Sequence, residues 1–364
     1  MSESNSKSIF YCTNSIWKSK SANFIQTHSM GKAFAHHIDD VHMVFRSSKD
    51  TKDDKVDYPY QQHIISAGES RFSRFLYSVR AIFLFVKVSK RNTFTYVYTR
   101  NMLFALLFKI LFPWKSLAIE LHTGIRHKSD KLIFYILTFL GVEIISITGS
   151  ILDELNTHGI DTSCALLAHD GHSFDIQSAD SVGPKEQQPL KVGYFGSLTP
   201  QKGLNLINEI IVSADPIKFR FHIFSKESSV LSDAEALDEI GFLNHNSVAT
   251  KMLEMDVFLM TLCPQGEDDA ISAYTSPLKM YEYLASGRPI IASEVNVLKE
   301  DTDDSMIFYA QNTSSSFIEV LNNIWVDREG ARSKAIKGLE HARLRTWNSR
   351  ARKIIHFLSK PTSS

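Results

Sequence analysis

Cysteine is scarce in this sequence, and its few cysteines stand far apart. The 364 residues include only Cys12, Cys164 and Cys263, an odd number without a CxxC pair. This spacing argues against a disulfide framework and against a zinc site, and it predicts a reducing, cytoplasmic compartment. The 43% of apolar residues suffice for a substantial core without any disulfide.

A charge excess is also missing. Forty Lys and Arg residues balance forty Asp and Glu residues, so the formal net charge is zero. Proteins that bind nucleic acid nonspecifically depend on an excess of positive charge, because the phosphate backbone supplies most of the attraction. This balance excludes nucleic acid as a partner.

Long hydrophobic runs are absent as well. The three longest apolar stretches are each interrupted by a charged residue: 75–88 by Arg80, 101–114 by Lys109 and 132–147 by Glu143. A membrane-spanning helix needs about 20 uninterrupted apolar residues. We therefore interpret these stretches as buried helices and strands. The first eight residues are polar and do not resemble a secretory signal.

The length predicts two domains at about 150 residues each. Composition changes near 177–188, where Ser, Asp, Gly, Pro, Lys and Glu crowd together without apolar periodicity. We predict an N-terminal domain at 1–180, a linker at 181–189, a C-terminal domain at 190–340, and a terminal helix at 341–364 that packs back on the N-terminal domain. A stripe of apolar residues at helical spacing supports that helix: Trp347, Ala351, Ile354, Ile355 and Leu358.

Short apolar runs alternate with longer segments of helical period in both halves. This alternation predicts the α/β class, with two Rossmann-like doubly wound domains that face each other across a cleft. Strands are expected at 8–11, 41–45, 95–98, 117–121 and 143–147, and in the second half at 191–195, 219–224, 257–260 and 289–292. Open parallel sheets bind ligands at the carboxyl ends of their strands, so the cleft is the expected active site.

The segment 191–204 begins as a strand, turns at Gly196 and starts a helix near Gly203. Backbone N–H groups at a helix start attract anions, and Lys202 adds a positive charge there. The segment is not a P-loop, since the GxxxxGK[ST] spacing is missing. The alternative is an ordinary strand-to-helix loop with a solvated lysine.

A helix is predicted at 276–287. Ser276 suits the N-cap, Pro277 suits the first helical position, and Gly287 ends the helix. Lys279 and Glu282 are three residues apart and share one face. Lys279 would lie beside a phosphate at the helix start, and Glu282 can accept hydrogen bonds from a ribose diol. The alternative is an exposed ion pair of little energetic consequence.

Two sequence blocks, at 192–204 and 275–293, resemble the donor-binding half of glycosyltransferase family 4, whose members are retaining enzymes of the GT-B fold. Upstream, 20–30 looks like the first loop and helix of the family's acceptor domain. The segments Tyr98-Thr-Arg-Asn101, Glu120-Leu-His122 and His169-Asp-Gly171 follow in the family's order. The resemblance covers most of the chain.

The resemblance implies transfer of a sugar from a nucleotide diphosphate sugar to a glycan or lipid-linked acceptor, in the assembly of surface polysaccharide or lipopolysaccharide. It implies catalytic roles for Lys202 at the leaving diphosphate, Glu282 at the ribose and His122 near the donor sugar. A lone histidine at a strand end is otherwise more often structural. The implied donor-binding residues are Gly196, Ser197, Lys202, Gly203, Ser276, Pro277, Leu278, Lys279 and Glu282, and the acceptor-side candidates are Ser21, Asn23 and Arg100.

The sequence departs from the family pattern at two positions. Ser197 stands where an arginine is usual, and Tyr274 stands where the first glutamate of the E-x7-E motif belongs. We expect Lys279 to supply the missing positive charge, with Arg288 as the reserve. Glu267, Asp268 or Asp269 would replace the missing carboxylate.

Two other classes of function remain open. The departures suggest a catalytically weak or inactive GT-B scaffold that binds sugar nucleotide or glycan. A nicotinamide-dependent enzyme is disfavoured, because the chain lacks GxGxxG with a following acidic residue. No cofactor and no metal is expected, and the acidic clusters at 267–269 and 301–304 are interpreted as solvated loops.

Basic residues gather in one part of the N-terminal half. Residues 61–130 contain eleven Lys or Arg and three acids, among segments rich in Phe and Leu. Such a combination is typical of a surface that rests on an anionic membrane, here its cytoplasmic face. The alternative is a set of core helices with solvated basic edges. A second basic run at 328–353 is interpreted as an exposed helix face.

Overall fold

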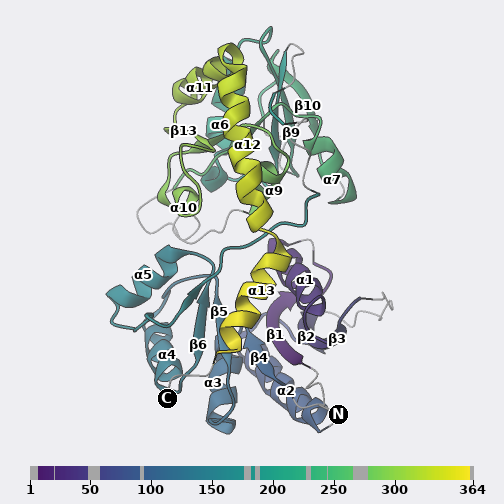
Figure 1. The fold of residues 1–364 in the computed structure, drawn as a ribbon, viewed down its shortest axis with the longest axis vertical. Coiled ribbons are helices and arrows are strands. Elements are labelled where there is room, and N and C mark those ends of the chain that lie inside the picture. Colours follow the sequence, from purple (N-terminus) through teal and green to yellow (C-terminus); the bar gives the residue numbers. More distant parts are fainter. Residues whose placement is uncertain are drawn as a thin grey trace. The chain divides into compact units, whose positions relative to one another are not determined.

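A computed structural model of the protein describes residues 7–19, 21–47, 58–90, 94–175, 182–184, 189–226, 231–243, 245–264 and 278–360 (Figure 1). The chain forms two compact units. The first comprises Met1–Asp170 and Trp347–Ser364, and the second comprises Gly171–Thr346. Each unit is a separate α/β body with its own sheet and its own core.

The chain leaves the first unit earlier than the expected linker at 181–189. In the described part of that linker, Gly183 donates its N–H to the carbonyl of Gly287 at 2.8 Å, and Arg288 donates to the carbonyl of Gly183. Val182 is buried against Ala335 and Leu339 of the second unit. These contacts attach 182–184 to the second unit. The chain returns between Thr346 and Trp347, six residues after the expected position.

The first unit consists of β1 (Ser8–Ile16), α1 (Ala22–Ala35), β2 (Asp40–Ser47), β3 (Gln61–Ser66), α2 (Arg71–Ser89), β4 (Tyr96–Thr99), α3 (Met102–Leu111), β5 (Ala118–Leu121), α4 (Lys128–Phe139), β6 (Glu143–Ser146), α5 (Gly149–Thr157), β7 (Leu166–Leu167) and α13 (Trp347–Leu358). Over its described residues the sheet has seven parallel strands in the order β3-β2-β1-β4-β5-β6-β7.

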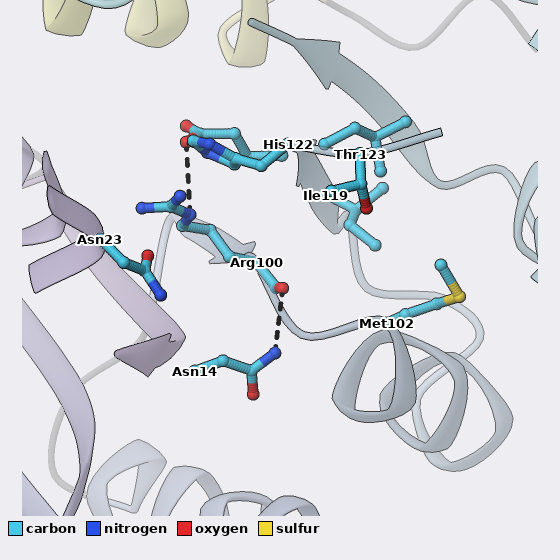
Figure 2. A pocket seen from close by; sticks show the side chains of 9 residues that line it. Asn14, Asn23, Arg100, Met102, Ile119, His122 and Thr123 are labelled. Atoms are coloured by element: carbon cyan, nitrogen blue, oxygen red, sulfur yellow. Dashed lines mark hydrogen bonds and ion pairs between the residues drawn. The ribbon is translucent and has the colours of Figure 1, made fainter. Parts of the chain in front are cut away.

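Helices cover both faces of this first sheet. On β1, Phe10 packs against Phe85 of α2 and Phe104 of α3, whereas the neighbouring Tyr11 packs against Phe34 of α1. Successive strand residues point to opposite faces, so α2 and α3 cover one face and α1 covers the other. Helix α13 packs against α1. From β1 the chain adds strands first on one side of the sheet, β2 and β3, and then on the other side, from β4 onward, as in a doubly wound fold. The switch point therefore lies between β1 and β4. A pocket opens there (Figure 2).

The second unit consists of β8 (Leu190–Phe195), the 3-10 turn η2 (Pro200–Lys202), α6 (Leu204–Ser213), β9 (Phe219–Phe224), β10 (Leu237–Gly241), α7 (His245–Met252), β11 (Val257–Met260), α9 (Leu278–Ala285), β12 (Ile290–Ser293), α10 (Asn296–Lys299), β13 (Phe308–Ala310), α11 (Ser314–Val326) and α12 (Arg328–Leu344). Among its described residues, six parallel strands pair in the order β10-β9-β8-β11-β12-β13.

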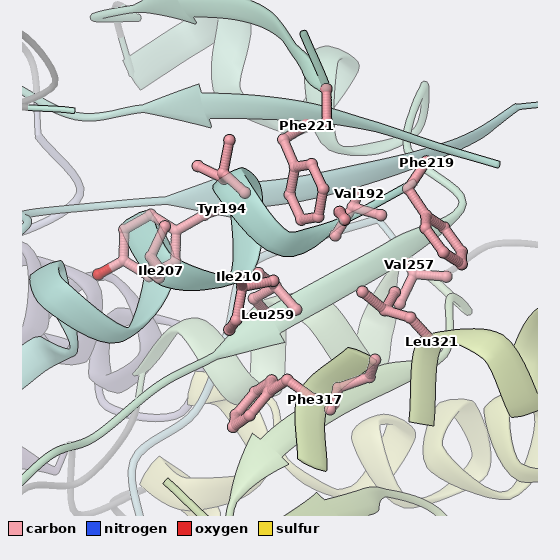
Figure 3. Packing of buried hydrophobic residues seen from close by; sticks show 14 of the residues in the cluster. Val192, Tyr194, Ile207, Ile210, Phe219, Phe221, Val257, Leu259, Phe317 and Leu321 are labelled. Atoms are coloured by element: carbon pink, nitrogen blue, oxygen red, sulfur yellow. The ribbon is translucent and has the colours of Figure 1, made fainter. Parts of the chain in front are cut away.

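The core of the second unit has two layers, because its central strands are apolar on both faces. Tyr194 of β8 and Leu259 of β11 pack against Ile210 of α6 and Phe317 of α11 in one layer, which Figure 3 shows. The next residue along β8, Phe195, lies in the other layer with residues of α9. Strands buried on both faces are typical of doubly wound parallel sheets. The predicted α/β class with two doubly wound sheets is confirmed.

The helices α2, α3 and α4 depart from the prediction that they are buried. Each buries one side only, and large apolar side chains such as Phe83 and Phe139 are exposed on the other side. In the part of the chain that the structure describes, no helix combines the length and the apolar character needed to cross a bilayer.

Candidate active site

The pocket of the first unit lies at the carboxyl ends of its central strands (Figure 2). It encloses about 170 Å³ and is lined by Asn14, Asn23, Arg100, Met102, Ile119, Glu120, Leu121, His122 and Thr123. Arg100 directly follows β4 and His122 directly follows β5, so the ends of two adjacent parallel strands bring these side chains together. The sequence predicted both residues for the active site, and Asn23 lines the same pocket.

A buried carboxylate, Glu120, is the centre of the charges in this pocket. Tyr98 and His122 hydrogen bond to it, and the guanidinium of Arg100 lies 3.6 Å away. Arg350 of α13 donates to its second oxygen at 3.0 Å. Burial raises the pKa of Glu120, but the charge of Arg350, the hydrogen bond with His122 and the charge of Arg100 outweigh it and hold the pKa well below its ordinary value.

Arg350 is a residue of the site that the sequence analysis missed. It was assigned to an exposed basic face at 328–353, yet its side chain is buried. Besides Glu120, it donates to the carbonyls of Ala168 and His169, and it lies 4.0 Å from the carboxylate of Asp170. A signal was present, because position 350 lies on the same helical face as Trp347 and Ile354.

His122 is positioned by Glu120. The imidazole Nε2 hydrogen bonds to the carboxylate, and burial together with the Arg100 charge lowers the pKa of His122. The ring is therefore neutral near pH 7, with its proton on Nε2 facing the carboxylate and a lone pair on Nδ1. One fifth of the side chain is exposed. A neutral imidazole at the rim of a polar pocket can exchange a hydrogen bond with a bound hydroxyl group.

The other two acceptor-side candidates are part of the loop and helix that border the pocket. Ser21 is the N-cap of α1 and accepts from the N–H of Phe24 at 3.3 Å. Asn23 lies in the first turn, where its side-chain oxygen accepts from the hydroxyl of Ser15 at 3.2 Å. Ser21 therefore stabilises the start of α1, whereas Asn23 is hydrogen bonded to β1 at the edge of the pocket.

In the second unit, the turn after β8 needs glycine at two positions. Gly196 has φ 127° and Gly203 has φ 82°, a region that L-residues with a Cβ rarely adopt. A Cβ on Gly203 would lie 2.6 Å from Cβ of Thr261. Between them Lys202 donates to the hydroxyl of Ser197 at 2.7 Å. The predicted turn at Gly196 and the helix start at Gly203 are both present, with η2 inserted between them.

Lys279 reaches the same turn from α9. A Cβ on Gly196 would lie only 3.4 Å from Lys279 Nζ, and the ammonium group lies 4.1 Å from the ring centre of Tyr194. The Nζ atom is buried and finds no hydrogen-bond acceptor among the described residues. Burial, together with the charge of Lys202, lowers the pKa of Lys279 to about 7. Two lysine side chains thus lie near the carboxyl end of β8.

Glu282 follows Lys279 one turn later on α9. Burial raises the pKa of Glu282 to about 7, against the opposing effect of the Lys279 charge. A half-buried carboxylate with a raised pKa is poised to hydrogen bond with hydroxyl groups, either as acceptor or as donor. The structure therefore brings together Gly196, Ser197, Lys202, Lys279 and Glu282, all of which the sequence predicted for the donor site.

Several predicted residues lie outside the described residues: Glu267, Asp268, Asp269, Tyr274, Ser276 and Pro277. Arg288, the reserve cation, is buried and donates to the backbone carbonyls of Gly183 and Leu253, so it does not supply charge to the Gly196 turn. Leu278, the remaining donor-site candidate, is the first residue of α9.

The acidic cluster at 301–304 is solvated only in part. Asp303 and Asp304 are exposed, as predicted. Asp301 is instead largely buried, and its carboxylate accepts from Arg345, from His341 at 3.0 Å and from Tyr281 at 3.0 Å. The described residues contain no group of three or more His, Cys, Asp or Glu side chains that could hold a metal ion.

Comparison with known proteins indicates the enzyme class and the fold. A family model described as Glycosyl transferases group 1 matches residues 189–327. No curated protein sequence matches the chain significantly. This match is confined to part of the second unit, and it confirms the predicted enzyme class, glycosyltransferase. The narrower assignment to family 4 stays a prediction.

Solved structures resemble the chain over nearly its whole length. A glycosyltransferase from Rickettsia africae aligns with a TM-score of 0.73 at 12% identity, over 97% of this chain and 98% of its own. HepE from Anabaena, solved in complex with UDP, aligns with a TM-score of 0.68 at 12% identity, over 97% and 99%. The lipopolysaccharide outer core galactosyltransferase WaaB aligns with a TM-score of 0.67 at 12% identity, over 96% and 99%. The predicted GT-B fold is confirmed.

Proposed function

We propose that this chain transfers a sugar from a nucleotide diphosphate sugar to a hydroxyl group of a glycan or lipid-linked acceptor. The bond between the anomeric carbon and the β-phosphate oxygen breaks, and the acceptor oxygen forms a new bond to that carbon and passes its proton to the departing β-phosphate. The nucleoside diphosphate leaves with the bonding electrons. The donor belongs to the second unit and the acceptor to the first. HepE binds UDP, and WaaB acts on the lipopolysaccharide outer core, which supports this substrate class.

The buried ammonium group of Lys279 is the observation that carries the proposal. Its Nζ lies in the Gly196 turn, adds to the charge of Lys202, and has no hydrogen-bond acceptor among the described residues. Holding a cation there is unfavourable unless an anion binds. A diphosphate satisfies both lysines, and its charge grows as the sugar departs. Fixed cations then stabilise the transition state more than the bound donor, which accelerates the reaction.

The remaining assignments belong to the same proposal. Glu282 accepts hydrogen bonds from the ribose, and His122 hydrogen bonds with the transferred sugar near its reacting carbon. Departure and attack occur on the same face of the sugar, so the reaction is retaining and requires no protein nucleophile. The proposal includes no metal ion. Surface polysaccharide or lipopolysaccharide assembly is the proposed pathway.

A thermal-shift experiment with sugar nucleotides tests the donor site. The pure protein is heated with UDP, GDP, ADP, CMP and dTDP sugars in the presence of EDTA. A donor at 100 times its dissociation constant should add about 2.7 kcal/mol of stability. We expect one stabilising base, with the shift lost in Lys202→Ala and Glu282→Ala and kept in Lys191→Ala, whose side chain is exposed.

Two outcomes would contradict parts of this proposal. A stabilising donor that gives no transfer to any acceptor extract would favour the binding scaffold suggested by Ser197 and Tyr274. Stabilisation that persists unchanged in both Lys202→Ala and Glu282→Ala would move the donor site away from the Gly196 turn.

A further inference from the structure

Three neighbouring helices of the first unit expose a large amount of apolar surface. Among the described residues, ten of the sixteen exposed large apolar side chains lie between Phe72 and Phe139, on α2, α3, α4 and the segment after α3. Their exposed fractions are high: 71% for Phe72, 69% for Phe83, 75% for Trp114 and 90% for Phe139. Contiguous apolar patches on a protein surface mark interaction sites. We call this surface the α2–α4 face.

The α2–α4 face is continuous because its helices are neighbours. Helix α3 contacts α2 on one side and α4 on the other, and Figure 1 shows the three together at one end of the first unit. On α2, Phe72, Phe75, Phe83 and Val86 recur at helical spacing and line one side, away from the buried Tyr77 and Ala81. The apolar residues therefore form a stripe on the solvent side of the helix.

Only positive charge accompanies this stripe. The chain contains no Asp or Glu between Glu69 and Glu120, a segment that includes all of α2 and α3. On α2 the exposed charged side chains are Arg71, Arg74, Arg80 and Lys87, and Lys90 follows at its end. Salt bridges take up little of this charge, since within the described part of α2 only Arg74 pairs with an acid, at 3.2 Å from Glu69.

The amino-acid composition of the α2–α4 face indicates what kind of partner it binds. Exposed aromatic and aliphatic side chains flanked by Lys and Arg are the composition of helices that lie in the interface of an anionic bilayer, where rings enter the headgroup region and cations meet lipid phosphates. A second copy of this chain is a poor partner, because it would place one basic surface against another. We propose that the α2–α4 face rests on an anionic lipid surface. This inference does not depend on the donor site.

Vesicle sedimentation tests the proposal with the full-length protein. We expect strong binding to phosphatidylcholine vesicles that contain phosphatidylglycerol, weak binding to phosphatidylcholine alone, and release from the anionic vesicles as salt is raised. The apolar part is tested by the double variant Phe83→Ser and Trp114→Ser, which should weaken binding about tenfold or more. Its matched control is Ile217→Ser and Val326→Ser, two exposed apolar residues of the second unit, which should bind like the wild type.

A second pair of variants tests the charge. Lys87→Gln with Lys90→Gln should lower binding to the anionic vesicles and leave the weak binding to neutral vesicles unchanged. Arg343→Gln with Lys191→Gln removes two exposed charges from the second unit and should change neither. Because all four changes lie on the surface, the melting temperature should stay close to that of the wild type.

Three results would overturn the proposal. The first is absence of binding to anionic vesicles. The second is binding that neither the aromatic nor the lysine variant reduces. The third is a dimer in light scattering that Phe83→Ser with Trp114→Ser separates into monomers, since the face would then be covered by a second copy of the chain.

Discussion

At the scale of single residues, the first-unit pocket depends on how buried charges are paired. Glu120 and Asp170 are buried acids, and Arg100 and Arg350 are buried bases beside them. Separating such charges from water is costly unless each finds a partner with good geometry. Arg350 is the residue that touches both acids and two backbone carbonyls. The pocket therefore depends on a side chain from the far end of the sequence.

We predict that Arg350→Ala destabilises the protein by about 3–5 kcal/mol, because it leaves Glu120 buried with one partner fewer. Arg352→Ala, an exposed position on the same helix, should change the stability by less than about 0.5 kcal/mol. Denaturant titration measures both. The pKa of Glu120 is held well below its ordinary value of 4.5 in the folded protein. The pairing of Glu120 therefore contributes to the free energy of unfolding at a pH above that ordinary value, and this contribution is lost as the pH falls. Equal stabilities of the two variants at pH 7 would contradict the pairing.

Donor affinity should depend on pH through Lys279. The pKa of Lys279 is lowered to about 7 by burial and by Lys202, and a diphosphate favours the charged form. UDP affinity should therefore fall as the pH rises above about 7, by up to about tenfold per pH unit. Isothermal titration between about pH 6 and pH 9 measures this slope.

Variants assign that slope to Lys279. Lys279→Met should bind UDP weakly at every pH and lose the slope, whereas Lys191→Met should keep both the affinity and the slope. A wild-type affinity that stays constant over this range would argue against a titrating lysine at the diphosphate.

At the scale of elements, the donor-side turn is set by backbone conformation. Gly203 has φ 82°, and it lies against Thr261, whose hydroxyl donates to the carbonyl of Lys202 at 2.6 Å. The backbone of the turn therefore sets the direction of the Lys202 side chain, whose ammonium group donates a hydrogen bond to the hydroxyl of Ser197. A change of backbone here moves the lysine as well as the loop.

We predict that Gly203→Ala costs about 1–3 kcal/mol, because alanine is strained at this φ and its Cβ meets Thr261. Gly241→Ala is the matched control, since a Cβ there meets nothing within 4 Å and φ is not positive. The midpoint of guanidinium unfolding compares the two variants. If Gly241→Ala proves as destabilising as Gly203→Ala, the steric argument is wrong.

A comparison of predicted and observed strands shows which strands can be recognised from the sequence. The predicted strands at 219–224 and 257–260 match β9 and β11 residue for residue. The strands that were not predicted are β3, β7, β10 and β13, and all four lie at the edges of their sheets. A central parallel strand is buried on both faces and reads as a continuous apolar run. An edge strand such as β10, Leu-Asp-Glu-Ile-Gly, is half exposed and carries no such signal.

At the scale of the whole molecule, the first unit is built from both ends of the chain. Helix α13 packs against α1, and its buried residues include Trp347, Ala351 and Ile354. It also inserts Arg350 beside Glu120. The second unit is a single continuous segment, Gly171–Thr346. Loss of the C-terminal residues should therefore affect the two units differently.

We predict that a chain ending at Thr346 loses protection in the first unit. Hydrogen exchange at β4 and β5 should speed up strongly, because the apolar stripe of α13 and the partner of Glu120 are both gone. The amides of β8 and β9 should keep their protection, since α13 adds nothing to their sheet. Unchanged protection in both units would show that α13 is dispensable for the first unit.

The features of this protein that its sequence alone predicts are those that depend on local chemistry. A helical or strand period is a property of a few adjacent residues, and so is a glycine such as Gly196 with a cap or charge near it. These local properties are sufficient to predict the two doubly wound sheets and the donor-side candidates. Burial is different, because it depends on segments that are distant in the sequence. Packing alone places Arg350 inside the first unit, buries Lys279 Nζ without a hydrogen-bond acceptor among the described residues, and leaves the α2–α4 face exposed in that part of the chain.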